Sequence, residues 1–192
     1  MSAEPVKNDN VTAERPTHYS RLAQWLHWTT FVMVVVAYAS INARKLFERG
    51  SDERILAVEF HFLVGMLVLM LTLPRLANRL KGRSPIVVPP QPMLSTLLSK
   101  ATHMLLYAFL IVQPLTGIVA RLAEGKGIGL PFTGLVVPSF FGTHEALASS
   151  LESVHVWVGE AFYWVIGLHI LAALFHRFVC KDNVMQRMTG RG

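Results

Sequence analysis

Histidine is the residue type whose placement in this sequence most clearly indicates chemistry. The segment HVWVGEAFYWVIGLH, residues 155–169, begins and ends with histidine and is otherwise almost entirely apolar or aromatic. Fourteen residues of α-helix turn through about 1400°, close to four full turns, and rise about 21 Å, so His155 and His169 would share one helix face at two depths. His176, seven residues further on, returns to that face. Since imidazole binds metals and titrates near neutral pH, this face predicts two separate cofactors and one further titratable group.

The elements that must position these histidines are membrane helices. The 192 residues are 52% hydrophobic and only 16% charged, which is too apolar for an ordinary soluble domain. Four windows, 25–43, 55–73, 103–119 and 154–179, have almost no interior charge. Each approaches or exceeds the roughly 20 residues that cross a bilayer core of about 30 Å. We therefore expect an all-α fold, a four-helix transmembrane bundle.

Basic residues indicate how the bundle is oriented. Residues 1–21, 74–100 and 177–192 together carry twelve Lys and Arg, whereas 44–54 and 121–126 carry six, which predicts that both termini and the middle connection are cytoplasmic. The first 20 residues lack the apolar region of a signal peptide, so we expect a cytosolic tail. Because the basic residues flank membrane segments, the pI of about 9.8 does not indicate nucleic-acid binding. The single cysteine, Cys180, excludes an internal disulfide and a CxxCH haem attachment.

Depth in the membrane suggests how the histidines pair. The first helix starts inside and the second outside, and His27 and His61 each lie about two turns from the start. The fourth helix runs from outside to inside, which puts His155 in the outer layer and His169 in the inner layer. The pairs would be His27 with His169 and His61 with His155. Two candidates leave the inner pair open, because His103 lies at a depth similar to that of His27 and His176 could replace His169.

Two opposed imidazoles at each level fit axial ligation of a flat macrocycle, for which haem is the obvious candidate. Gly65, Gly159 and Gly167 follow or precede a histidine by two to four residues and remove bulk beside such a ring. Glycine is also common at ordinary membrane-helix contacts, so this support is mild. Zinc is the competing ligand, but it prefers four tetrahedral ligands that include thiolate or carboxylate, and the spans hold no such cluster.

Two connections between the helices have a distinctive composition. The segment SPIVVPPQP carries four prolines in nine residues and is expected to be a stiff, non-helical connector. The segment GKGIGLPFTGLVVPSFFG, within residues 122–145, is rich in Gly, Pro and Phe. Its apolarity predicts a loop that lies on the outer face of the bundle or dips into the membrane interface, either as a simple cover for helix ends or as a lid over a site.

Four segments together resemble the bacterial cytochrome b561 family. They are YSRLAQWLHW, FHFLVGMLVLMLTLPRL, ESVHVWVGEAFYWVIGLHILAALFHRF and the closing KDNVMQRM. The resemblance covers about residues 19–189, which leaves a polar tail at 1–18 and a short tail at 190–192. It implies a four-helix bundle with two b-type haems. The implied iron ligands are His27 and His169 for the inner haem, and His61 and His155 for the outer haem.

The pattern is most similar to the superoxide oxidase branch of that family. The resemblance implies electron transfer from superoxide, or another small one-electron donor, at the periplasmic face to ubiquinone in the inner membrane. It also places His176 in the quinone region, where the ring could deliver a proton as a catalytic residue. Basic side chains are placed to neutralise haem propionates: Arg21, Arg75 and Arg79 inside, and Arg44, Lys45 and Arg121 outside. Their alternative role is simple interfacial anchoring.

Two other functions remain open from the sequence. The chain could be a haem b membrane subunit that relays electrons between a partner dehydrogenase or hydrogenase and the quinone pool, although its small loops offer no docking domain. It could also be a non-redox ion or proton carrier that uses intramembrane histidines, in which case the protein would be colourless. Net charge on the two outer connections is close to zero or slightly negative, so steering of superoxide by a whole positive face is not evident.

Overall fold

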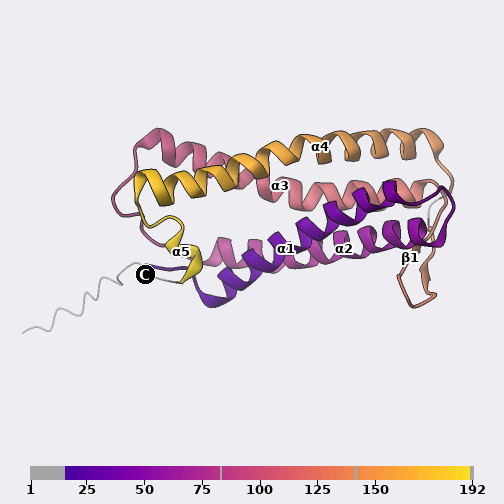
Figure 1. The fold of residues 1–192 in the computed structure, drawn as a ribbon, viewed down its shortest axis with the longest axis horizontal. Helices are drawn as coiled ribbons and strands as arrows, with labels where there is room; N and C mark the ends of the chain where they lie inside the picture. Colours follow the sequence, from indigo (N-terminus) through magenta and orange to yellow (C-terminus); the bar gives the residue numbers. More distant parts are fainter. Residues whose placement is uncertain (1–15, 83, 141, 191–192) are drawn as a thin grey trace, which may run out of the picture.

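The chain folds into an elongated bundle of four long helices (Figure 1). The computed structural model describes residues 16–82, 84–140 and 142–190, so most of the expected 1–18 tail and residues 191–192 lie outside the described residues. The long helices are α1 (Arg21–Ala43), α2 (Asp52–Lys81), α3 (Met93–Ala123) and α4 (Glu145–Phe175). The short elements are η1 (Arg44–Leu46), β1 (Ile128–Gly129), β2 (Val136–Val137), the π-helical turn η2 (His176–Cys180) and α5 (Gln186–Thr189).

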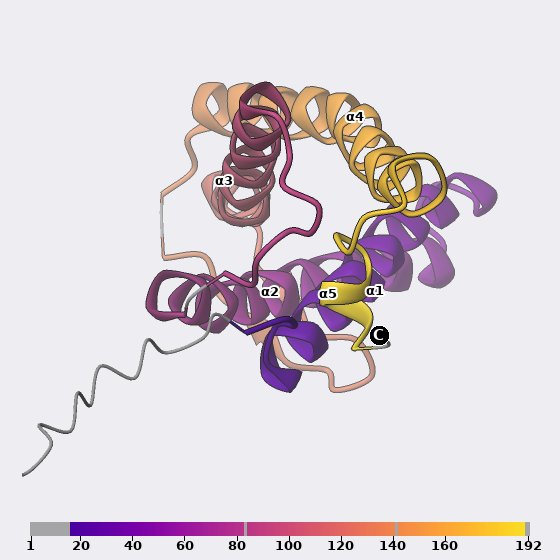
Figure 2. The same cartoon turned by 90° about the vertical axis from the view of Figure 1, so that its left-hand side faces the viewer.

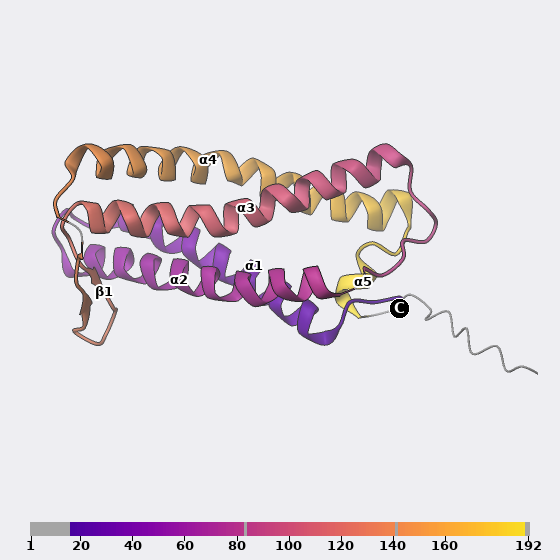
Figure 3. The same cartoon turned by 180° about the vertical axis from the view of Figure 1, so that it is seen from behind.

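The helices pack as two pairs. Seen along the bundle in Figure 2, α1 and α2 form one side and α3 and α4 the other, and Figure 3 shows α2 beside α3 from behind. A small core of Val68, Phe109, Leu110 and Phe162 joins the two pairs near mid-bundle. The rings of Phe109 and Phe162 stack face to face, which fixes the spacing of α3 and α4. The two histidine levels therefore lie on either side of an apolar plug.

All four long helices are suited to a membrane. The candidate spans, counted with the adjoining turns, are 26 to 36 residues long and strongly apolar. Large apolar side chains such as Trp164, Leu168 and Leu171 are exposed on α4, as lipid contact requires and water would penalise. The described residues thus bear out the expected four-helix architecture, with longer helices than the four apolar windows alone indicated.

Helix starts follow local capping chemistry. The Ser20 hydroxyl accepts a hydrogen bond from the Ala23 N–H, and the Ser51 hydroxyl accepts one from the Arg54 N–H. Ser20 and Ser51 are therefore the N-caps of α1 and α2. The proline-rich connector is non-helical between α2 and α3 as predicted.

We call the two ends of the bundle the termini end and the hairpin end. The termini end holds the start of α1, the 84–92 connector and α5, and the hairpin end holds η1 and the β1–β2 hairpin (Figure 1). The hairpin is antiparallel, with Ile128 opposite Val137. It forms inside the loop that the sequence predicted only as irregular, because Gly134 adopts a positive φ of 68° at the turn and Gly129 admits the Glu59 carboxylate of α2 against its backbone.

Candidate functional site

Two imidazoles face each other near the hairpin end. The ring centroids of His61 on α2 and His155 on α4 are 6.2 Å apart. Nδ1 of His61 lies 2.9 Å from the Ala37 carbonyl oxygen, and Nδ1 of His155 lies 2.9 Å from the Gln113 carbonyl oxygen. A carbonyl only accepts, so each Nδ1 carries the hydrogen and donates it. Each Nε2 is left with a free lone pair, which is the tautomer a metal-binding histidine needs.

Helix α3 holds His155 in place through three residues that the sequence analysis did not single out. The Gln113 side-chain amide donates to the His155 carbonyl oxygen at 2.7 Å, and the Thr116 hydroxyl lies 3.3 Å from His155 Nδ1. Gly117 meets the imidazole directly, since a Cβ there would lie 2.8 Å from His155 Cε1. The available signal was the pair of polar residues and the glycine in QPLTG, an unusual run within an apolar span.

A cavity of about 410 Å³ opens between all four helices at this level. Its wall includes both histidines and three glycines, Gly65, Gly117 and Gly159. A Cβ at Gly65 would touch nothing within 4 Å, so the space beside His61 is free. Two imidazoles that bind one metal ion from opposite sides, through nitrogens about 2.0 Å from it, have centroids roughly 6 Å apart. The hairpin-end site therefore fits a flat macrocycle with two axial histidines.

Charged side chains line the mouth of this cavity. The three basic residues expected near outer propionates are all present, together with three glutamates: Arg44, Lys45, Arg121, Glu124, Glu152 and Glu160. Arg121 already forms an ion pair with Glu124 at 3.5 Å, and Lys126 reaches the same carboxylate at 3.2 Å. The mouth is thus mixed in charge, in agreement with the near-zero balance of the outer connections.

Three imidazoles, rather than two, gather near the termini end. The His169 ring centroid lies 6.5 Å from that of His27 on α1 and 5.7 Å from that of His103 on α3. His103 Nδ1 donates to the Ser99 carbonyl oxygen at 2.6 Å, which leaves its Nε2 free. The His169 imidazole forms no hydrogen bond with the residues that the structure describes. Ring spacing alone therefore does not choose between His27 and His103.

Arg75 distinguishes His27 from the other histidines. Its Nη2 donates to His27 Nδ1 at 2.8 Å, and its guanidinium also lies over the Tyr107 ring. Because arginine only donates, the hydrogen of a neutral His27 lies on Nε2 in this arrangement. Metal binding through that Nε2 requires Arg75 to release the ring. The sequence placed Arg75 beside a propionate; in the structure its partner is the ring of His27.

The other arginines of this end differ in their surroundings. The side chain of Arg21, the first residue of α1, is exposed and makes no hydrogen bond or ion pair within the described part of the chain. Arg79 donates to the Ser84 hydroxyl. Arg187, which the sequence analysis did not select, has a buried Nε without a hydrogen-bond partner, and burial lowers the pKa of its guanidinium. An orphaned guanidinium nitrogen close enough to feel the charge of Arg79 fits an anionic group in this region.

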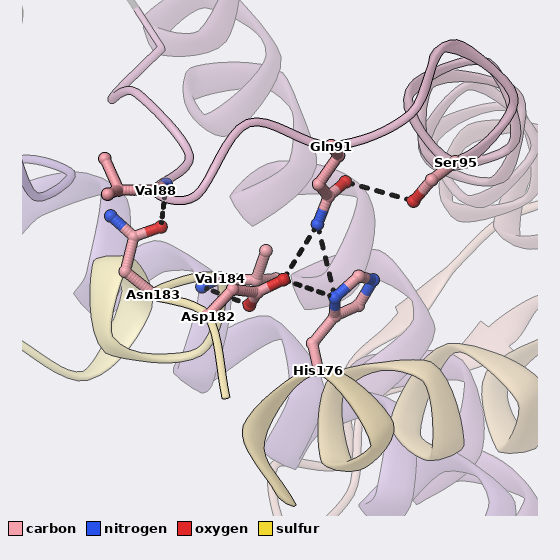
Figure 4. A network of polar contacts seen from close by, with 7 residues as sticks. All are labelled: Val88, Gln91, Ser95, His176, Asp182, Asn183 and Val184. Carbon is pink, nitrogen blue, oxygen red and sulfur yellow. Dashed lines mark hydrogen bonds and ion pairs between the residues drawn. The ribbon is translucent and has the colours of Figure 1, made fainter. Parts of the chain in front are cut away.

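His176 lies apart from the three imidazoles, in a polar cluster with Gln91 and Asp182 (Figure 4). His176 Nδ1 is 2.7 Å from Asp182 Oδ2, and the Gln91 amide donates to that same oxygen at 3.0 Å. Burial alone would raise the pKa of the Asp182 carboxyl, but hydrogen bonds from the Val184 N–H, Gln91 and His176 outweigh it and hold that pKa below its ordinary value. The side chain is only 4% exposed. It is a buried carboxylate with several partners.

A second cavity, of about 420 Å³, lies next to this cluster. It is lined by Trp28, Arg177, Met185, Gln186 and Thr189. With the Gln186 amide oriented so that its oxygen faces Arg177, its nitrogen donates to the Asp182 carbonyl oxygen at 3.0 Å. Trp28 follows His27 directly, and their rings meet edge to face with centroids 5.2 Å apart. The cavity wall thus includes a direct chain neighbour of His27, Trp28, and a direct chain neighbour of His176, Arg177.

Comparison with known proteins agrees with this architecture. A model of the prokaryotic cytochrome b561 family matches residues 18–191. The chain is 33% identical to the probable superoxide oxidase CybB of Yersinia pestis over 171 residues, which are 88% of this chain and 94% of the relative. It is 31% identical to cytochrome b561 homolog 1 of Escherichia coli over 173 residues, 90% of this chain and 97% of the relative. Cytochrome b561 homolog 2 of E. coli is 25% identical over 176 residues.

Proposed function

Because this chain belongs to the prokaryotic cytochrome b561 family, whose members bind b-type haem in the inner membrane, we propose that it moves electrons from superoxide to ubiquinone. Electron transfer through haem b in the membrane is the activity that membership of this family implies. Superoxide is supported by the relative named as a probable superoxide oxidase, which this chain matches over most of its length. Another small one-electron donor at the same face is the alternative donor.

Two haems, one at each histidine level, are the cofactors of this proposal. The observation that carries it is the pair of levels on α4, where His155 and His169 each face an imidazole from another helix at 6.2 and 6.5 Å. His61 and His155 would hold one haem, and His27 and His169 the other. When bound, each haem supplies a one-electron centre. The protein contributes ligands about 21 Å apart along α4, with the Phe109–Phe162 plug between them.

The count of electrons and protons fits a one-electron donor and a two-electron acceptor. Two superoxide ions lose one electron each and leave as two molecules of oxygen, and one ubiquinone gains two electrons and two protons to become ubiquinol. Arg44 and Lys45 at the hairpin-end mouth are placed to attract the anion, while Arg121 is held by Glu124. In our proposal this mouth is periplasmic, and both termini are cytoplasmic, as the distribution of Lys and Arg predicts.

Ubiquinone reduction belongs at the termini end in this proposal. The quinone ring is flat, apolar and flanked by two hydrogen-bond acceptors, and the cavity beside Trp28 combines aromatic and aliphatic walls with Arg177 and Gln186 as donors. Quinone reduction also consumes protons, and the His176 imidazole lies at this end with a carboxylate partner. We therefore assign His176 the catalytic role of proton donor.

Stopped-flow spectroscopy of the purified, haem-loaded chain tests the proposal. On rapid mixing, superoxide should reduce the haems. Ubiquinone added afterwards should reoxidise them and form ubiquinol. If superoxide leaves the haems oxidised while a partner dehydrogenase or hydrogenase reduces them, the chain is a relay subunit. A colourless preparation that never takes up haem would instead favour the non-redox carrier.

A further inference from the structure

The proton chemistry of a histidine depends on which ring nitrogen carries the hydrogen, and the surroundings of His176 determine which one does. Nδ1 has two polar neighbours, the Asp182 carboxylate oxygen at 2.7 Å and the Gln91 amide nitrogen at 3.2 Å. The amide nitrogen is a donor, and its better partner is the same Asp182 oxygen at 3.0 Å. Of the two contacts of Nδ1, the short one to the carboxylate is therefore the hydrogen bond, and Nδ1–H donates to Asp182.

We propose that Asp182 is a positioning residue that holds His176 in the Nδ1–H tautomer, so that Nε2 alone takes up and releases the proton used in quinone reduction. The inference rests on the proposed function for the identity of the proton acceptor. Figure 4 shows the second ring nitrogen on the side of the imidazole away from Asp182 and Gln91.

The fold holds Asp182 in position independently of the imidazole. Lys181 adopts a left-handed conformation with φ 52°, which turns the chain back so that the Asp182 N–H donates to the His176 carbonyl oxygen at 3.3 Å. The second carboxylate oxygen accepts from the Val184 N–H at 3.0 Å. Gln91 is itself fixed, because its oxygen accepts from the Ser95 hydroxyl at 3.1 Å. The carboxylate is therefore preorganised by the backbone of the turn and by the connector.

Asn183 ties the same turn to the 84–92 connector. Its side-chain oxygen accepts from the Val88 N–H at 2.9 Å, its amide donates to the Ile86 carbonyl oxygen at 3.2 Å, and its N–H donates to the Val88 carbonyl oxygen at 3.2 Å. Among the described residues, the hydrogen bonds of Asn183 go to Ile86, Val88 and Arg187 and not to the imidazole. It thus offers a control in which the turn is loosened while the carboxylate on Nδ1 is retained.

Other ionisable groups around the pair do not compete for Nδ1. On its own turn His176 is followed by Arg177, Cys180 and Lys181, all exposed. From α5, the Arg187 guanidinium acts on Asp182 as a nearby positive charge. The Arg177 guanidinium reaches Gln186 when that amide oxygen faces it. These neighbours are cations or a thiol, so within the described residues Asp182 is the carboxylate that meets the ring.

The proton step has a simple balance. The imidazolium Nε2–H bond breaks, the proton goes to a quinone oxygen, and a neutral imidazole with Nδ1–H remains on Asp182. Water at the termini end returns a proton to Nε2. Two such cycles, with two electrons from the donor, convert the quinone to the quinol, and Asp182 keeps its charge throughout.

Asp182→Asn tests the positioning role, because an amide can present its own N–H to Nδ1 and so favour the Nε2–H tautomer. We expect haem content and reduction by superoxide to be unchanged, and reoxidation by ubiquinone to slow by about ten- to a hundredfold. Asp182→Glu should recover part of the rate, and Asn183→Ala should retain most of it.

Nitrogen NMR of the dithionite-reduced, ¹⁵N-histidine-labelled protein reads the tautomer without any quinone. His176 should show the Nδ1–H pattern in the wild type and in Asn183→Ala, and the reverse pattern in Asp182→Asn. An Nε2–H pattern in the wild type, or an unchanged pattern in Asp182→Asn, would overturn the inference. Equal slowing by Asn183→Ala would also overturn it, since loosening of the turn would then suffice. A wild type that makes no quinol defeats the proposed function instead, while the NMR result still stands.

Discussion

The hairpin-end and termini-end sites use the same residue type but differ in what holds the rings. At the hairpin end, His61 and His155 each donate Nδ1–H to a backbone carbonyl, and a cavity of about 410 Å³ separates the helices. At the termini end, three imidazoles share the space and Arg75 donates to His27. The backbone carbonyls are held in place by their helices, whereas the side chain of Arg75 can rotate away from the ring. The hairpin-end site is therefore prepared for a metal by the fold itself, and the termini-end site requires a side chain to move.

Removing single histidines should have the largest effect and would break or confirm this comparison. We expect His61→Ala and His27→Ala each to lower the haem content from two to one per chain, measured by the pyridine haemochrome method. His103→Ala should retain two, because the family resemblance assigns the iron to His27. If His103→Ala loses a haem and His27→Ala does not, the ligands of the termini-end site have to be exchanged.

Glycine substitutions should have intermediate effects and would sharpen the account of the hairpin-end site. Gly117→Ala places a methyl group 2.8 Å from His155 Cε1, so it should weaken haem binding and destabilise the protein by about 1–3 kcal/mol even without haem. Gly65→Ala meets no atom within 4 Å and should weaken haem binding only. Thermal unfolding of haem-free and haem-loaded protein separates the two effects. A Gly65→Ala variant with unchanged haem affinity would show that the ring does not occupy the space beside His61.

Acid should have the smallest effect, confined to the termini end. The pKa of Asp182 is lower in the folded chain than its unfolded value of about 3.9, so its stabilising effect is complete above that value and is lost as the pH falls through the folded pKa. We expect hydrogen exchange of residues 182–190, corrected for its intrinsic pH dependence, to rise below about pH 4, by the equivalent of about 1 kcal/mol. Asp182→Asn should remove this dependence. Parallel acceleration at the β1–β2 hairpin would mean that the whole fold opens instead.

The sequence predicted most of the fold because its signals are periodic or compositional. Apolar length set the four helices, and helical spacing put His155 and His169 on one face at two depths. The proline-rich connector also followed from local chemistry. Contacts between helices could not be predicted in this way. Gln113 and Gly117 matter because α3 passes against His155, and nothing in their own helix indicates that neighbour.

The termini end was the less predictable part for the same reason. The partner of Arg75 is set by its rotamer and by the approach of α1, so the sequence placed a positive charge there without naming His27. The contact between His176 and Asp182 depends on the left-handed conformation of Lys181, a residue type that rarely adopts it. The β1–β2 hairpin depends on the positive φ of Gly134 in its turn, and on Gly129, whose role appears only once Glu59 of α2 lies beside it.

The position of α5 in the chain has a consequence for biogenesis. The Arg187 carbonyl oxygen accepts the Tyr19 N–H at 3.0 Å, and the Met188 carbonyl oxygen accepts the Trp28 indole N–H at 3.2 Å, so α5 fastens the start of α1 beside His27. Both histidines of the hairpin-end site, His61 and His155, are synthesised more than thirty residues before Arg187 and Met188. We therefore expect the nascent protein to assemble the hairpin-end site first, and to complete the termini-end site only after α5 has been synthesised.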